Sequence, residues 1–300
     1  MYGDWQLIYA GVDHHFGTKQ HDVQLVKWVF AADAYRTDDV ERDRRDGINV
    51  GHDFVEAGEL QIDVLIDFTS YPASVEECAR LAWEARRSFA KAWRADPVRQ
   101  QAGALAELVM GGEQAIEGRP RGISWDDDHA GVGYITGKAR FEPAGTGVFD
   151  VTTGDGGWHE QTVGLMSPQL VGIVAPLVAP ISTALETDRR EAFEVTGDEP
   201  AHAIVTARGP LTAGEVELVA GWRMILNRTL RWGDVAVIDS RPGHEAMTLN
   251  GRPVNLLTAG SVQLVDAVIP PGIQEFGLRG TSLEGTATAT IRWRNTKEAN

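Results

Sequence analysis

The feature that most constrains this chain is a period-two alternation of apolar and polar residues in its clearest segments. In residues 58–68, four aliphatic side chains share one face of an extended chain: Leu60, Ile62, Val64 and Ile66. Residues 22–30 alternate in the same way. Because successive side chains of a strand point to opposite faces, each segment predicts a half-buried antiparallel strand.

Only one segment has a convincing helical period. Ser74 and Glu77 fit a capping box, and an apolar stripe with three- and four-residue spacing follows: Cys78, Leu81, Ala82, Ala85, Phe89 and Ala92. Asp96 and Pro97 end the pattern. The spacing predicts a helix over 74–94 that packs on the apolar face of the strands before it. The lone cysteine, Cys78, forms no disulfide within the chain, and we expect a buried thiol.

The rest of the pattern predicts short strands separated by turns. The candidates before residue 191 are 104–110, 131–141 and 147–152, and those after it are 192–196, 201–208, 214–218, 223–230, 234–239, 245–249, 261–264, 274–279 and 286–293. Asn250 and Gly251 form the sharpest hairpin signal. Many short strands at this spacing favour a β-sandwich, so we expect a mainly β chain with two domains, 1–144 and 145–300.

Two segments interrupt the strands. Residues 33–55 hold a mixed-charge run at 37–47, which we interpret as a solvated loop; the alternative is an arm that grips a neighbouring subunit. Residues 163–180 predict an extended linker or edge element within a linker region of 145–190. The apolar stretch 165–185 contains Pro168, Pro176 and Pro180, so we expect no membrane helix.

The net charge is −15, and both halves are acidic. Specific binding to nucleic acid is therefore disfavoured, because phosphate contacts need clustered Lys and Arg. The first residues carry no basic segment and no secretory apolar core. We therefore expect folding in a cytoplasm.

No segment matches a nucleophile elbow, a phosphate loop or a metalloprotease helix, so we predict no enzyme, no catalytic residue, no cofactor and no metal. Asp126, Asp127, Asp128 and His129 could hold Ca²⁺, but they lack an EF-hand pattern, and we favour a surface loop. His14, His15 and His21 are either a metal patch or an exposed loop, and we favour the loop. His159 and Glu160 could act as an acid/base pair, with no second partner nearby in the sequence.

Sugar binding is the main alternative, because β-sandwiches can present an exposed aromatic ring with convergent polar groups. Trp222, Trp232 and Trp293 are the available rings in the C-terminal region. Trp293 lies in an alternating strand, so we expect it to be buried. A glycoside hydrolase would need two carboxylates across a cleft, and the sequence nominates no pair.

The order of these features resembles the distal tail protein family of siphophages over nearly the whole chain. The N-terminal likeness comprises residues 7–11, Phe16 with Gly17, 23–29, 36–38, 43–47, 51–53, 59–68, the helix and 141–143. The C-terminal likeness comprises residues 164–168 with one glycine lost, 194–200, 208–210, 230–234, 237–239, 249–251, 269–272 and 291–293. Thr196 stands where the family has Asn.

The resemblance implies a ring-forming N-terminal domain, a β-sandwich or split barrel related to the tail tube subunit, followed by a galectin-like β-sandwich. It implies a homo-hexameric ring at the tail tip of the virion, assembled in the host cytoplasm. The implied partners are the tail tube protein, the tape measure protein and the tail-tip hub or tail-associated protein. From the negative charge of the chain we expect an acidic lumen that lets phage DNA pass without sticking. A host cell-wall adhesin acting through the C-terminal sandwich is the alternative function.

Overall fold

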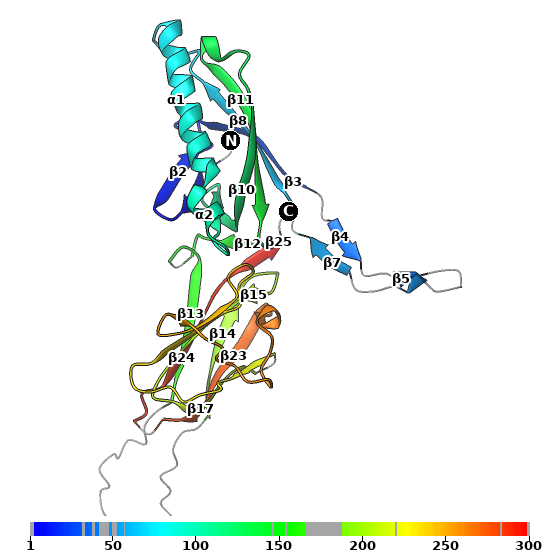
Figure 1. Cartoon of the computed structure of the whole chain (residues 1–300), viewed down its shortest axis with the longest axis vertical. Helices are drawn as coiled ribbons and strands as arrows, with labels where there is room; N and C mark the ends of the chain where they lie inside the picture. The colour runs from blue at the N-terminus through cyan, green and yellow to red at the C-terminus, as the bar shows by residue number, and fades with distance from the viewer. Residues whose placement is uncertain are drawn as a thin grey trace, which may run out of the picture. The chain divides into compact units, whose positions relative to one another are not determined.

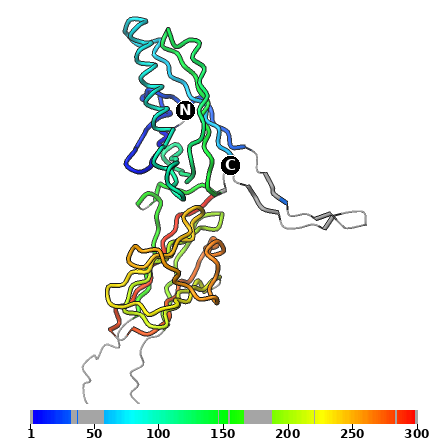
Figure 2. The backbone as a smooth tube through the Cα atoms, viewed as in Figure 1, coloured from blue at the N-terminus to red at the C-terminus, as the bar shows by residue number. Residues whose placement is uncertain are grey.

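The computed structural model describes residues 3–31, 34–37, 40–41, 48–49, 53–56, 58–145, 147–153, 155–165, 188–219, 221–282 and 284–298. They form two compact units, the first of Met1–Thr152 with Glu298–Asn300 and the second of Thr153–Lys297. Figure 1 labels their elements, and Figure 2 traces the backbone. The linker predicted over 163–180 lies outside the described residues beyond residue 165, as does most of the link motif at 164–168.

The first unit is built on a nine-stranded sheet. Its main path runs in the order β2 (Val12–Phe16), β1 (Trp5–Tyr9), β9 (Ala106–Met110), β10 (Gln114–Asp126), β11 (Tyr134–Pro143), β8 (Leu60–Asp67) and β3 (Gln24–Phe30). β12 (Gly147–Asp150) pairs with β10, and β25 (Thr296–Glu298) pairs with β12. The alternation that predicted a half-buried strand is confirmed in β8, where the four aliphatic residues are buried.

The long helix α1 (Val75–Arg94) covers one face of this sheet (Figure 1). Ser74 caps it by accepting a hydrogen bond from the Glu77 N–H, and the helix ends at Ala95, as the sequence predicts. Its buried stripe includes Cys78, so the prediction of a buried thiol is confirmed. A short second helix, α2 (Asp96–Gln100), follows directly.

Aromatic rings join α1 to the sheet. The Phe89 ring centroid lies 5.2 Å from that of Phe16 and 5.4 Å from that of Trp93. Two polar side chains add directional contacts: the Trp93 indole N–H donates to the Arg140 carbonyl at 3.2 Å, and the buried Tyr9 hydroxyl donates to the Ala92 carbonyl at 2.6 Å. Burial of the rings supplies the packing, and these two bonds fix how the helix lies on the strands.

The longest strand, β10, was not predicted, because Gly118, Pro120 and Gly122 interrupt its pattern. Its register with β11 shifts between Pro120 and Ile123, where a bulge accommodates the proline. The strand predicted over 131–141 begins later, at Tyr134, because Ala130–Val132 form the 3-10 turn η1.

The two outermost strands of the path approach each other at one point. Gly17, directly after β2, forms a bridge with Gln24 at the start of β3. The backbone N–H of Leu25 donates to the Gly17 carbonyl at 3.0 Å, and the N–H of Gly17 donates to the Val23 carbonyl at 2.9 Å. The sheet is therefore partly closed beside the turn at residues 18–23.

The charged excursion between β3 and β8 contains paired strands, so the loop interpretation is wrong for its described part. β4 (Ala34–Thr37) pairs with β7 (Asp53–Glu56), and β5 (Val40–Glu41) pairs with β6 (Ile48–Asn49). These ladders form sheets separate from the nine-stranded one. Residues 42–47, at the centre of the mixed-charge run, lie outside the described part.

The second unit is a β-sandwich. One sheet has the order β13 (Trp158–Gly164), β24 (Thr288–Arg294), β16 (Ile204–Arg208), β19 (Val235–Asp239), β20 (Ala246–Leu249) and β21 (Arg252–Pro253). The other has the order β14 (Asp188–Val195), β23 (Gly272–Thr281), β17 (Thr212–Leu218) and β18 (Arg223–Ile225). β15 (Ala201–His202) pairs with β22 (Val268–Ile269). Side chains from the two larger sheets share one core, including Val205, Ile291, Val216 and Phe276.

Local signals in this unit are largely confirmed. The hairpin at Asn250 and Gly251 joins β20 to β21, with φ of 52° and 76°, the left-handed conformation that this residue pair favours. The strand predicted over 261–264 is wrong, because the Ser261 side chain bonds the Ile225 backbone and the 3-10 turn η2 (Leu264–Asp266) follows. The strand predicted over 223–230 stops at Ile225.

The expected mainly β fold with one packed helix is confirmed. Within the described part of the chain, no helix combines the length and hydropathy of a membrane span.

Candidate functional site

The residues singled out by sequence chemistry lie in separate places. The Asp127 carboxylate pairs with Arg86 at 3.0 Å, whereas the Asp126 carboxylate accepts the Asp128 N–H at 3.2 Å. His129 precedes η1 and lies against Tyr134, with 6.4 Å between ring centroids. In the described chain these acidic groups do not converge on one point that could hold Ca²⁺.

His159 and Glu160 are neighbours on β13 and therefore point to opposite faces of its sheet. The His159 ring stacks on Trp293 at 5.7 Å, and its Nε2 lies 3.0 Å from the Asn295 amide nitrogen. Glu160 lies on the outer side, 3.8 Å from Arg292. The two side chains are held by different partners and do not form an acid/base pair.

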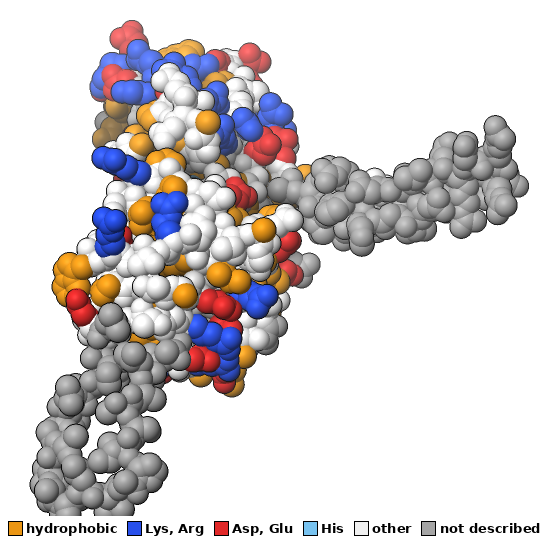
Figure 3. Space-filling model, turned by 60° about the horizontal axis from the view of Figure 1, so that its bottom comes forward, with side chains coloured by type: hydrophobic (Ala, Val, Ile, Leu, Met, Phe, Trp, Pro, Cys, Tyr) orange, Lys and Arg blue, Asp and Glu red, His pale blue; other side chains and the backbone are white. Residues whose placement is uncertain are grey.

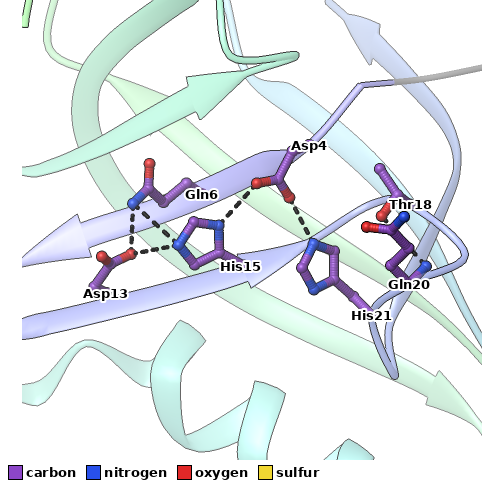
Figure 4. Close-up of polar contacts among 7 residues, drawn as sticks. All are labelled: Asp4, Gln6, Asp13, His15, Thr18, Gln20 and His21. Atoms are coloured by element: carbon purple, nitrogen blue, oxygen red, sulfur yellow. Dashed lines mark hydrogen bonds and ion pairs between the residues drawn. The ribbon is translucent and has the colours of Figure 1, made fainter.

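The three N-terminal histidines divide into two groups, and the loop prediction is wrong for two of them. His14 and His15 lie on β2, where His14 contacts Phe89 with 5.6 Å between ring centroids. Burial lowers the pKa of His14 below its ordinary value of 6.5. His15 and His21 instead turn toward Asp4, a residue that the sequence reasoning did not nominate (Figure 4).

The tryptophans proposed as sugar platforms are mostly buried. Trp293 is 3% exposed, which confirms its predicted burial, and Trp222 is 6% exposed and donates to the Val268 carbonyl at 2.8 Å. Trp232 is 69% exposed in the turn before β19. Of the three, Trp232 alone presents a free ring face to solvent.

The face of the nine-stranded sheet opposite α1 carries polar and charged side chains. We call this surface the open face and define it by Lys27, Val29, Gln61, Asp63, Lys138 and Arg140. A shallow groove on this side is lined by Gln61, Gly122, Ile123, Ser124, Lys138 and Arg140. Lys138 faces Asp63 across the ladder, and Arg140 pairs with Glu59 at 3.3 Å. The open face therefore carries mixed charge with exposed apolar surface at Val29.

The edge strand β3 adds apolar surface to this side. Val26 is 50% exposed beside the bulge in the ladder, and Val29 is 45% exposed. Gln24 and Leu25, at the start of β3, meet Gly17 on the edge away from β8. Beyond them β3 pairs with β8 alone in the described chain, so the rest of that edge has backbone groups available for a second strand. Figure 3, which is turned so that the bottom of Figure 1 comes forward, shows acidic and basic side chains side by side elsewhere on the described surface as well. This side of the first unit therefore combines a strand edge, two exposed valines and mixed charge.

No protein-family model and no curated protein sequence matches this chain. Among solved structures, it is similar to the SPP1 Dit (gp 19.1) protein, described as a paradigm of the hub adsorption apparatus in phages that infect Gram-positive bacteria. That likeness has a TM-score of 0.55 at 12% identity and covers 97% of this chain and 98% of that chain. At this identity it establishes a shared fold.

Two chains of the phage P2 baseplate in its activated conformation, with Ca and with Sr, have TM-scores of 0.46 at 10% identity. The match to the Ca structure covers 99% of this chain and 98% of that chain, and the match to the Sr structure covers 96% and 97%. Scores at this level carry no argument.

Proposed function

We propose that this chain is a structural subunit of the distal ring at the tail tip of a long-tailed bacteriophage. The observation that carries the proposal is the fold shared with SPP1 Dit over 97% of this chain and 98% of that chain. The likeness extends over both units, so it supports a role for the whole chain. A likeness confined to the β-sandwich would support less, because β-sandwiches occur in proteins of many functions.

We further propose that six copies form a ring that joins the end of the tail tube to the tip and adsorption apparatus. In this role the tail tube protein, the tape measure protein and the tail-associated hub protein are its neighbours. The first unit forms the ring, and the second is a galectin-like sandwich. Phage DNA passes through the lumen without specific contacts.

The surfaces of the first unit suit this role. Head-to-tail contacts use two different patches on each copy, and they close into a ring when the rotation divides a full turn. The edge of β3, with Val26 and Val29 exposed, is one such patch. The β4–β7 ladder, which is separate from the main sheet, is suited to clasp an adjacent copy. No enzymatic step is part of the proposal.

The oligomeric state of the full chain tests the proposal. Native mass measurement and negative-stain images of the purified chain, alone and co-expressed with the tail tube and hub proteins of the same phage, should show a six-membered ring. A chain that stays monomeric in every combination, or that is absent from virions, would refute the proposal.

A variant pair locates the contact. Val29→Asp places a charge on the edge strand β3, and we expect it to prevent ring formation without unfolding the chain, since the residue is 45% exposed. The matched control is Val265→Asp, at a valine that is 60% exposed on η2 of the second unit. Rings that persist in Val29→Asp would exclude the β3 edge as the contact.

One observation favours a second function, the binding of host cell-wall carbohydrate by the sandwich. Trp232, 69% exposed, provides a flat apolar ring of the kind that stacks on sugars. Pull-down of the full chain by host cell wall, lost in Trp232→Ala, would support adhesion. Equal retention of both proteins would refute it.

A further inference from the structure

Three side chains from separate segments meet beside the point where the sheet partly closes. Asp4 precedes β1, His15 lies on β2, and His21 lies in the turn between β2 and β3. The His15 Nδ1 is 2.8 Å from Asp4 Oδ2, and the His21 Nε2 is 2.7 Å from Asp4 Oδ1 (Figure 4). One ligand atom from each residue lies within 4.8 Å of the other two.

A second layer orients His15. Its Nε2 lies 3.2 Å from Asp13 Oδ1, and the Gln6 amide nitrogen donates to the same oxygen at 2.6 Å. When a metal ion binds Nδ1, the ring proton is on Nε2, where the Asp13 carboxylate can accept it and hold the ring in place. The Gln6 amide nitrogen also lies 3.3 Å from His15 Nε2, and it donates to that nitrogen when the proton of the ring is on Nδ1. Nδ1 is the atom that faces Asp4.

Two imidazole nitrogens share the carboxylate of Asp4. A carboxylate only accepts, so each of the two short contacts to Asp4 requires a proton on the imidazole nitrogen. A divalent ion can replace both bridging protons, because it accepts a lone pair from each nitrogen and from the carboxylate.

The donor set selects the kind of ion. Two imidazole nitrogens and one carboxylate oxygen suit Zn²⁺ and related first-row transition ions, whereas Ca²⁺ and Mg²⁺ prefer oxygen. Zinc lies about 2.0–2.2 Å from such ligands, so small side-chain rotations would bring all three into range. Asp4, His15 and His21 are 45%, 42% and 28% exposed, which leaves access for the ion and a position for water.

The backbone holds the ligands in place without an ion. The His21 N–H donates to the Thr18 carbonyl at 3.1 Å, and the N–H of Gly17 donates to the Val23 carbonyl at 2.9 Å, so the turn that carries His21 is closed. β1 and β2 pair from Trp5 with Phe16 to Tyr9 with Val12, which fixes Asp4 beside His15. Such preorganisation reduces the cost of binding.

We propose that Asp4, His15 and His21 bind one divalent transition-metal ion, of which Zn²⁺ is the representative, with Asp13 as the residue that orients His15. The ion fastens the segment before β1 to β2 and to the β2–β3 turn, where the open sheet partly closes. The inference stands on these residues alone, independently of ring formation.

Calorimetric titration of the full chain, purified without a histidine tag, tests the site with ZnCl₂. We expect one equivalent to bind. His15→Ala and His21→Ala should each weaken binding by about ten-fold or more, and Asp13→Asn should weaken it by about ten-fold through loss of orientation. His129→Ala, which removes an exposed histidine next to three aspartates, should leave the affinity unchanged.

Imidazole ¹⁵N spectra of the wild-type chain identify the ligands without relying on variants. On addition of ZnCl₂, the resonances of two of the eight histidines should shift strongly, and CaCl₂ should shift neither. The absence of one-equivalent binding, an affinity that His15→Ala and His21→Ala leave intact, or shifts confined to other histidines would overturn the proposal.

Discussion

Replacing Phe89 by alanine should remove the centre of the packing between α1 and the sheet. The side chain is fully buried, and its ring lies 5.2 Å from Phe16, 5.4 Å from Trp93 and 6.1 Å from Trp125. Burying a phenylalanine side chain contributes about 1.5–3 kcal/mol, and the cavity left by truncation adds to the loss. Partner rings from both the helix and the strands surround the position, so the site cannot collapse easily. We expect Phe89→Ala to destabilise the first unit by about 3–5 kcal/mol.

Urea unfolding followed by tryptophan fluorescence and near-ultraviolet circular dichroism measures this loss. The matched control is Val75→Ala, on the same helix at a side chain that is 61% exposed, which should change stability by less than about 0.5 kcal/mol. A second control, Phe276→Ala, removes a fully buried ring from the second unit and should act on that unit's transition. A loss below about 1 kcal/mol in Phe89→Ala, or an equal loss in Val75→Ala, would refute the assignment of this ring as the anchor of the helix.

Three further outcomes are expected. Burial lowers the pKa of His202 below its ordinary value of 6.5, so the folded chain favours the neutral imidazole. The free energy of unfolding should therefore decrease as the pH falls below that value, because the unfolded chain binds the proton more readily. Urea midpoints between about pH 7.5 and 5 should fall less in His202→Gln than in the wild type. Ser74→Ala removes the cap that accepts the Glu77 N–H at 3.3 Å and should lower the stability of the first unit by about 1 kcal/mol in the same assay. Gly118→Ala places a Cβ 2.3 Å from the Glu142 carbonyl oxygen and should lower the stability of the first unit by about 1–3 kcal/mol. In the control, Gly122→Ala, the new Cβ meets only the flexible end of Arg140 at 3.4 Å, and stability should hardly change. Equal thermal midpoints for these two variants would contradict the packing described for β10.

Local signals predicted those elements whose stability depends on nearby residues. The capping box at Ser74 and the stripe through Phe89 are satisfied within one helix, and the Asn250–Gly251 hairpin requires only a left-handed turn. The alternation in residues 60–67 is equally local, because one buried face determines which side chains point inward. For these segments the sequence pattern and the fold agree closely.

Distant pairing decided the elements that the sequence did not reveal. β10 continues through Pro120 because a bulge and its neighbours β9 and β11 support it. β13 exists because it pairs with β24, and the Thr162 hydroxyl lies 2.8 Å from that of Thr290 across a separation of 128 residues. The partners of both strands lie outside any short sequence window.

In the candidate metal site, too, the arrangement of the residues depends on strand pairing and not on a local sequence signal. His14 and His15 are adjacent in the sequence, and the pleat of β2 sends one toward Phe89 and the other toward Asp4. Asp4, His15 and His21 do not follow the spacing of a known metal-ligand motif, so the sequence alone did not predict that they lie together.

The sequence by itself determined the mainly β class, the position and cap of the helix, and the sharp hairpin, since these follow from side-chain periodicity and local backbone preference. The tertiary structure alone decided which strand edges are exposed and which side chains share a face. It also decided which distant residues lie within bonding distance, because these properties depend on the pairing of strands far apart in the chain.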